Sequence, residues 1–233
     1  MNIAGQIAIR FFAMLLLLLA NGVVLIYMLR KVLGHLHLRI GPNRVGPFGL
    51  LQTTADVVKL LTKEDLRPAD SDKWLFNIAP YLVFVPSFMA YMLMVFGPDL
   101  AITHLDTGVL VLFAVMSLIP LGVVMAGWSA NSKWSLIGGM RAAGQQIAYE
   151  IPLLLSALGP VMMAGSMDLS KIVAAQAGVW FGFIPRWFVL PQIVAFVIYV
   201  ISAQADTQQT PFDMSEAESE LITGFANEYG GMR

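Results

Sequence analysis

The stretch RIGPNRVGPFGLLQTTADVVKLLTKE, residues 39–64, decides the fold, because it is charged and rich in glycine and proline yet lies between two long apolar runs. A helix needs roughly 20 predominantly apolar residues to cross a lipid bilayer. Five runs approach or meet that requirement, and they lie at about 11–29, 75–97, 108–130, 144–165 and 187–203, the last being the shortest. The sequence therefore predicts an all-α, polytopic membrane protein, a single membrane domain over residues 1–233 with about five transmembrane helices.

The composition agrees with a membrane protein and excludes several other classes. Hydrophobic residues make up 58% of the chain and charged residues only 12%. The net charge of −1 argues against a nucleic-acid partner, which would require a concentrated basic face. The chain has no cysteine, so it can form neither a disulfide nor a thiolate-ligated iron–sulfur cluster. Its three histidines lack metal-ligand neighbours at a standard spacing, so we expect no metal site.

The positions of the basic residues predict how the chain is oriented. Lys and Arg are concentrated between the first two spans, whereas the segment 97–107 has neither; the bases between these spans include Lys31, Arg39, Arg44, Lys59, Lys63, Arg67 and Lys73. Loops rich in Lys and Arg remain in the cytoplasm. We therefore expect cytoplasmic loops at about 30–74 and 204–233, and a periplasmic N-terminus.

The first cytoplasmic loop has the pattern of an amphipathic helix at the membrane interface. Apolar residues and Thr54 recur at helical spacing, and polar residues take the other side; the first set is Leu50, Leu51, Thr54, Val57, Val58 and Leu61, the second Gln52, Asp56, Lys59 and Lys63. Gly and Pro before this helix predict a shaped turn that presents Arg39 and Arg44 to acids of a neighbouring subunit. The alternative is a helix that only rests on lipid headgroups.

One acid lies inside the fourth apolar run. Glu150 occurs in RAAGQQIAYEIPLLL, at a depth where a carboxylate costs on the order of 3 kcal/mol or more. It needs a partner or a proton there, and Gln146 lies one helical turn before it. We favour a role in proton relay, because ionisable groups inside a membrane are functional by default. A neutral glutamic acid that only links helices is the structural alternative.

A second group of acids follows the fifth span, with Arg233 as the one base; the acids are Asp206, Asp213, Glu216, Glu218, Glu220 and Glu228. Thr210, Pro211 and Asp213 resemble the start of a helix, so part of this charge could serve to stabilise that start. On such a helix Asp213, Glu216 and Glu220 would share a face. Crowded carboxylates repel, so some would hold protons and form a proton or charge relay.

Four blocks of this sequence together resemble one family, the membrane subunit of respiratory complex I that is called the H subunit in bacteria and subunit 1 in mitochondria. The blocks are RIGPNRVGPFGLLQTTADVVKLLTKED, GWSANSKWSLIGGMRAAGQQIAYEIP, TPFDMSEAESELITGF and NEYGGMR. The resemblance implies a subunit of a proton-translocating NADH-quinone oxidoreductase, a translocase of the bacterial inner membrane. It also implies that quinone is the substrate, that this chain binds no cofactor, and that iron–sulfur clusters and FMN belong to partner subunits.

The resemblance assigns two sets of site residues. The set expected at the quinone site or the interface with the peripheral arm is Arg39, Arg44, Asp56 and Lys59. The set expected to relay protons or charge is Glu150, Asp213, Glu216, Glu218, Glu220 and Glu228. The expected partners are the other membrane and peripheral subunits, quinone and the lipid bilayer.

The chain also departs from the family pattern. Where the family reads close to AETNRTPFDLPEAE, this chain has Asp206, Gln209 and Ser215, so its loop loses a positive charge and some stiffness. Gly230 stands where the family has serine. The family continues beyond the acidic loop with further spans, so we expect a truncated or split subunit and another chain that supplies the missing helices. Two alternatives remain: the related subunit of an energy-converting hydrogenase or ferredoxin- or F420-linked dehydrogenase, and an inactive membrane anchor.

Overall fold

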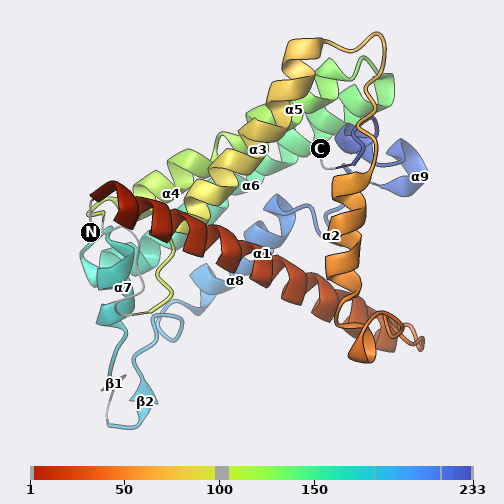
Figure 1. Cartoon of the computed structure of the whole chain (residues 1–233). Helices are drawn as coiled ribbons and strands as arrows, with labels where there is room; N and C mark the ends of the chain where they lie inside the picture. Colours follow the sequence, from red (N-terminus) through yellow and green to blue (C-terminus); the bar gives the residue numbers. More distant parts are fainter. Residues whose placement is uncertain (1–2, 98–104, 181, 216, 232–233) are drawn as a thin grey trace. The chain divides into compact units, whose positions relative to one another are not determined.

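The described part of the protein is mostly helical (Figure 1). The computed structural model describes residues 3–97, 105–180, 182–215 and 217–231. Its α-helices are α1 (Ile3–Leu36), α2 (Gln52–Thr62), α3 (Lys73–Leu93), α4 (Gly108–Met116), α5 (Ile119–Ser129), α6 (Lys133–Ala164), α7 (Leu169–Ala175), α8 (Ile193–Asp206) and α9 (Glu218–Leu221). Short 3-10 helices cover Pro47–Gly49 and Gly224–Ala226, and the strands β1 (Val179–Trp180) and β2 (Ile184–Pro185) pair antiparallel. The chain divides into two units, residues 1–66 with 229–233, and residues 67–228.

The first unit contains the long helix α1 and the amphipathic helix α2. The loop between them is held by Lys31, whose Nζ donates to the Pro42 carbonyl at 2.7 Å, and by Tyr27, whose hydroxyl donates to the Phe48 carbonyl at 3.0 Å. Gly46 and Gly49 adopt positive φ angles of 72° and 79°, and a Cβ at Gly49 would overlap the backbone of Pro42. The shaped turn predicted from the glycines and prolines is therefore confirmed.

Helix α2 confirms the predicted amphipathic helix. Leu51, Val58 and Leu61 expose 55%, 55% and 59% of their surface, so the apolar side of this helix is open to lipid or to a partner. Asp56 belongs to the polar side and contacts α1.

The second unit is built on α6, which packs against α5 and α8, and α5 packs in turn against α3. Small residues bring α5 and α6 close together: a Cβ added to Gly139 would lie 3.2 Å from the Gly127 Cα. On the neighbouring position of α6, a Cβ added to Gly138 would lie 2.6 Å from the Gly224 Cα. This side of α6 is buried although its sequence is not strongly apolar, which explains why the helix begins at Lys133, well before the expected boundary at 144.

Within the described residues, four helical segments are long and apolar enough to cross a membrane: Ile9–Leu36, Lys73–Leu93, Gly108–Ser129 and Lys133–Ala164. They confirm four of the five expected spans and define a polytopic membrane protein. The third segment is broken between α4 and α5, because Pro120 lacks the N–H that would bond back to Met116 and its ring crowds that turn.

The fifth expected span differs from the prediction. Its helix, α8, begins at Ile193 instead of 187 and has 14 residues, so it is about 21 Å long, less than the roughly 30 Å of a bilayer core. Pro191 explains the late start, because a proline disfavours the helical conformation of the residue before it.

The helix start predicted at Thr210, Pro211 and Asp213 is wrong. Residues 207–215 and 217 form turns and irregular structure, and α9 begins only at Glu218. Side chains satisfy backbone carbonyls of this segment in place of helical hydrogen bonds: Gln204 Nε2 donates to the Thr210 carbonyl at 2.6 Å, and Gln145 Nε2 to the Phe212 carbonyl at 2.7 Å. These tertiary contacts override the local sequence signal.

Candidate functional site

The second unit contains a cavity of about 340 Å³ that two carboxylic acids line. Glu150 comes from the middle of α6, and Asp206 is the last residue of α8. Gln146, one turn before Glu150, also lines the cavity. Both acids are half-buried. The packing of α6 against α8 therefore brings together two carboxyl groups that lie far apart in the sequence.

Another part of the cavity wall is formed where the third span is broken. Met116, Ile119 and Pro120 line it, from the end of α4 and the start of α5. A broken helix leaves backbone carbonyls without their helical partners. The cavity thus combines two acids, an amide and a helix break at the depth of a membrane span.

Gln146 adds an unused hydrogen-bonding atom to this cavity. Its Oε1 is buried and has no hydrogen-bond partner within the part of the chain that the structure describes. A buried acceptor without a donor costs about 1 to 3 kcal/mol. A donor such as a water molecule or a protonated carboxyl group in the cavity would remove that cost.

Two carboxylates that share a cavity of low dielectric repel one another, which favours a state in which one of them holds a proton. The cavity is large enough for several water molecules, each of which takes about 30 Å³ in the liquid. This arrangement can accept, hold and release protons. Sequence reasoning selected Glu150 but left Asp206 out of the site, since only the packing of α6 on α8 pairs them.

The segment that follows Asp206 is tied to the cavity by Gln145. Its Nε2 donates to the Ala205 carbonyl at 2.6 Å and to the Phe212 carbonyl at 2.7 Å. The Phe212 ring packs on Tyr149, with 5.6 Å between ring centroids. Gln145 and Tyr149 are the residues beside Gln146 and Glu150, so the same turns of α6 carry the cavity and hold the acidic segment.

Ser215, where the family pattern has proline, is fully buried, and its hydroxyl donates to Gln208 Oε1 at 2.9 Å. This contact holds the segment at the point where the sequence predicts a loss of stiffness. Gln209, which replaces an arginine of the family pattern, is exposed.

The other acids predicted for the relay do not form a row on one helical face. Asp213 is exposed outside any helix, Glu228 is half-buried, and Glu220 pairs with Arg141 at 2.7 Å. Glu218 begins α9, and Glu216 lies outside the described residues. Their part in a relay remains a prediction.

The residues predicted for the quinone site or the peripheral arm lie in the first unit. Asp56 forms an ion pair with Arg30 of α1 and accepts from Gln52 Nε2 at 3.2 Å, while Lys59 Nζ lies 4.0 Å from its carboxylate. The hydrogen bond from Arg30, followed by that from Gln52, lowers the pKa of Asp56 below its usual value of 3.8. Sequence reasoning did not select Arg30, because nothing in its local pattern points to Asp56.

Arg39 and Arg44 lie in the turn before α2, and both are exposed. Their contact with an acidic partner remains a prediction. Across the four described ranges, no group of three or more His, Asp or Glu side chains is arranged to hold a metal ion.

These features define a polytopic α-helical membrane protein with a carboxyl-lined cavity among its spanning helices. Comparison with known proteins gives the family. The sequence model of the NADH dehydrogenase family matches residues 9–233, so the chain belongs to that family.

Several curated bacterial proteins are close relatives. A protein of Brevibacillus brevis is 49% identical over 223 residues, which is 95% of this chain and 64% of the relative. A protein of Geobacillus kaustophilus is 51% identical over 205 residues, which is 88% of this chain and 60% of the relative. Both are named as the H subunit of NADH-quinone oxidoreductase. The chain thus spans 60% to 64% of the length of these two relatives.

Proposed function

We propose that this chain is a membrane subunit of a proton-translocating NADH-quinone oxidoreductase, in which it borders the quinone site and couples quinone reduction to proton movement. Its family and the names of its relatives support the assignment to this enzyme. The observation that carries the coupling role is the cavity shared by Glu150 and Asp206.

In this proposal Glu150 and Asp206 form a site that binds and releases a proton. One acid of the pair holds a proton, and repulsion between the two carboxylates favours the binding of a proton when both become ionised. A change in charge at the quinone site would shift this balance and move a proton through the cavity. Gln146 Oε1 would accept a hydrogen bond from the protonated acid or from a water molecule between the acids.

The first unit supplies the surface toward the peripheral subunits. Arg39 and Arg44 are exposed and suit acidic side chains of a partner or the polar head of quinone. The ion pair of Asp56 with Arg30 fixes α2 against α1, and Lys59 adds a further positive charge beside it. These contacts would hold the first loop in the shape that the partner meets.

The remaining assignments follow from the same proposal. The chain has no cysteine, so iron–sulfur clusters belong to partner subunits, as would FMN. The location is the inner membrane of a bacterium, with loops 30–74 and 204–233 in the cytoplasm and the N-terminus in the periplasm. Many apolar side chains of α1 are open, including Phe12 at 65% and Leu16 at 71% exposed, which suits lipid or neighbouring membrane subunits.

The names of the relatives do not favour the hydrogenase or ferredoxin-linked alternative. An activity assay distinguishes the proposed function from the inactive-anchor alternative. The chain should be produced in a bacterium that lacks its own homologous membrane subunit, and membranes assayed for inhibitor-sensitive NADH-quinone reduction and for the proton gradient. We expect both activities to return. Assembly of the complex with neither activity would support the anchor and contradict the proposal.

A further inference from the structure

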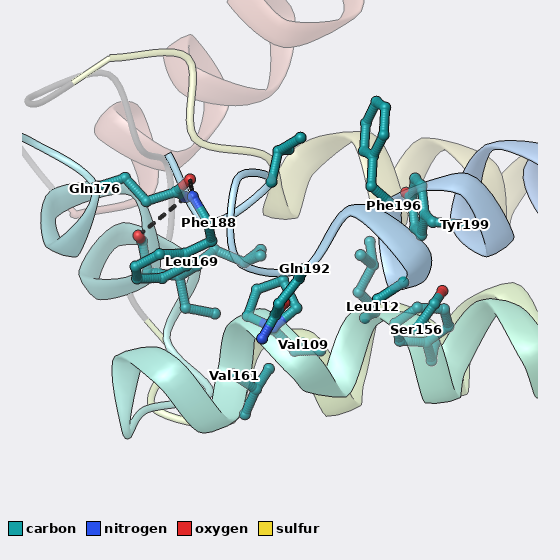
Figure 2. Close-up of a pocket in the computed structure, with 16 residues that line it drawn as sticks. Val109, Leu112, Ser156, Val161, Leu169, Gln176, Phe188, Gln192, Phe196 and Tyr199 are labelled. Carbon is teal, nitrogen blue, oxygen red and sulfur yellow. Dashed lines mark hydrogen bonds between the residues drawn. The ribbon is translucent and has the colours of Figure 1, made fainter. Parts of the chain in front are cut away.

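A second cavity lies in unit 2 at the end that holds α7 (Figure 2). Its volume is about 310 Å³, and its wall comes from α4, α6, α7 and the start of α8. Most of the lining is apolar, including Val109, Leu112, Val161, Leu169 and Phe196. Such a wall points to a ligand that is apolar over most of its length.

This apolar pocket follows the direction of the helices. It extends along α8 from Gln192 to Tyr199, a distance of about 10 Å at the rise of an α-helix. On α6 it covers the stretch from Ser156 to Val161. Since α6 is long and apolar enough to span a membrane, the pocket runs in the direction that a lipid chain takes in the bilayer.

A polar atom that lacks a partner lies partway along the pocket, where Figure 2 shows Gln192 between Phe188 and Phe196. Gln192 Oε1 is buried and accepts no hydrogen bond from any residue that the structure describes. A Cβ added to Gly159 would lie 2.6 Å from this oxygen, so the absence of a side chain at 159 leaves room for the amide. A ligand for this site should therefore bring a hydrogen-bond donor to Gln192.

The other glutamine of the pocket is already engaged. Gln176 Oε1 accepts from the Phe188 backbone N–H at 3.2 Å, and Gln176 Nε2 donates to the Ile172 carbonyl at 3.3 Å. Gln176 thus belongs to the wall.

Trp180 and Trp187 lie in the same connection between α7 and α8, and tryptophan is typical of the headgroup level of a membrane.

We propose that this pocket binds one acyl chain of a phospholipid whose headgroup has a hydrogen-bond donor, and that the headgroup donates to Gln192 Oε1. The ammonium of phosphatidylethanolamine has such a donor, whereas phosphatidylcholine has none. Quinone does not meet the requirement, because its carbonyl oxygens only accept; quinol has hydroxyl donors, so labelling of the pocket by a photoreactive quinol in place of the phospholipid would overturn the proposal. Phe113 lines both this pocket and the acid cavity, so the lipid would pack against the wall that separates them.

The test uses phosphatidylethanolamine and phosphatidylcholine with the same photoreactive acyl chain, each as a trace component of phosphatidylcholine bilayers that contain the purified protein. After irradiation, labelled peptides are mapped. We expect labelling to concentrate on residues 156–161 and 192–199, and to be about fivefold stronger for phosphatidylethanolamine, the effect of one hydrogen bond. Gly159→Leu should reduce this labelling about tenfold, because its side chain enters the space beside Gln192.

Gln192→Leu provides a second variant that keeps the apolar pocket. This variant should retain acyl-chain labelling, but phosphatidylethanolamine and phosphatidylcholine should label it equally strongly. Met162→Leu is the matched control, since Met162 lies on the same helix, is 81% exposed and does not line the pocket. Equal labelling by the two lipids in the unaltered protein would overturn the proposal. So would labelling spread evenly over all exposed helices, or cross-linking of the pocket to another polypeptide instead of lipid.

Discussion

Gln145 should control how readily the acidic segment after Asp206 opens. Its Nε2 bonds the carbonyls of Ala205 and Phe212 at 2.6 Å and 2.7 Å, and the side chain is half-buried. Each such bond contributes about 1 kcal/mol net, so Gln145→Leu should cost about 2 kcal/mol of local stability. Since about 1.4 kcal/mol is a factor of ten, the segment should open about 30 times more often.

The absence of native cysteine makes this opening measurable. Ser215 is fully buried, so a cysteine introduced by Ser215→Cys reacts with a thiol reagent only when the segment opens. Adding Gln145→Leu should accelerate that reaction about 30-fold, by the estimate of two lost hydrogen bonds. Gln176→Leu, a change of the same kind beside α7, is the control and should leave the rate unchanged. A rate within about threefold of the parent in the Gln145 variant would refute the assigned role, because it corresponds to less than one hydrogen bond.

Three further predictions follow from other contacts. Gly139→Leu should destabilise the α5–α6 packing by more than about 2 kcal/mol, because its Cβ alone would lie 3.2 Å from the Gly127 Cα; a thermal unfolding midpoint equal to that of the parent protein would contradict this. Glu220→Gln should lower stability by less than about 1 kcal/mol, because the Arg141–Glu220 pair is largely exposed, and a double-mutant cycle with Arg141→Gln measures that coupling. The pKa of Asp56 is lower in the folded protein than its usual 3.8, so the ionised carboxylate stabilises the fold fully above pH 3.8, and this stabilisation is lost as the pH falls through the lower folded pKa. Amide exchange in α2, corrected for intrinsic rates, should become faster over that pH range. Asp56→Asn should abolish this pH dependence.

Hydropathy was sufficient to predict most of the membrane architecture. Long apolar runs are helical in any bilayer protein, because the backbone must satisfy its own hydrogen bonds there. The amphipathic pattern from Leu50 to Leu61 was equally informative, since α2 forms over most of it. The boundaries were less predictable. The break before Pro120 and the late start of α8 after Pro191 depend on single prolines inside continuous apolar runs.

The candidate site was only partly predictable. Glu150 could be selected from its cost at membrane depth, but its pairing with Asp206 requires knowledge of which helices pack together. The acidic segment was misread because Thr210, Pro211 and Asp213 fit a helix start locally, whereas side-chain hydrogen bonds from α6 and α8 hold the segment in another form. Arg30 was missed for the same reason, since its partner Asp56 lies on another helix.

The central claim, that Glu150 and Asp206 form a proton-holding pair, is tested most directly by proton transport. Membranes should be prepared from the complemented bacterium carrying the parent chain, Glu150→Gln, Asp206→Asn or Asp106→Asn. Asp106→Asn is the control, because the Asp106 side chain is 90% exposed and lies on a connecting segment. With equal assembly verified, the account predicts that each cavity variant loses most of the proton gradient formed during NADH oxidation, and that the control keeps it. Gradients at the parent level in both cavity variants would contradict the account.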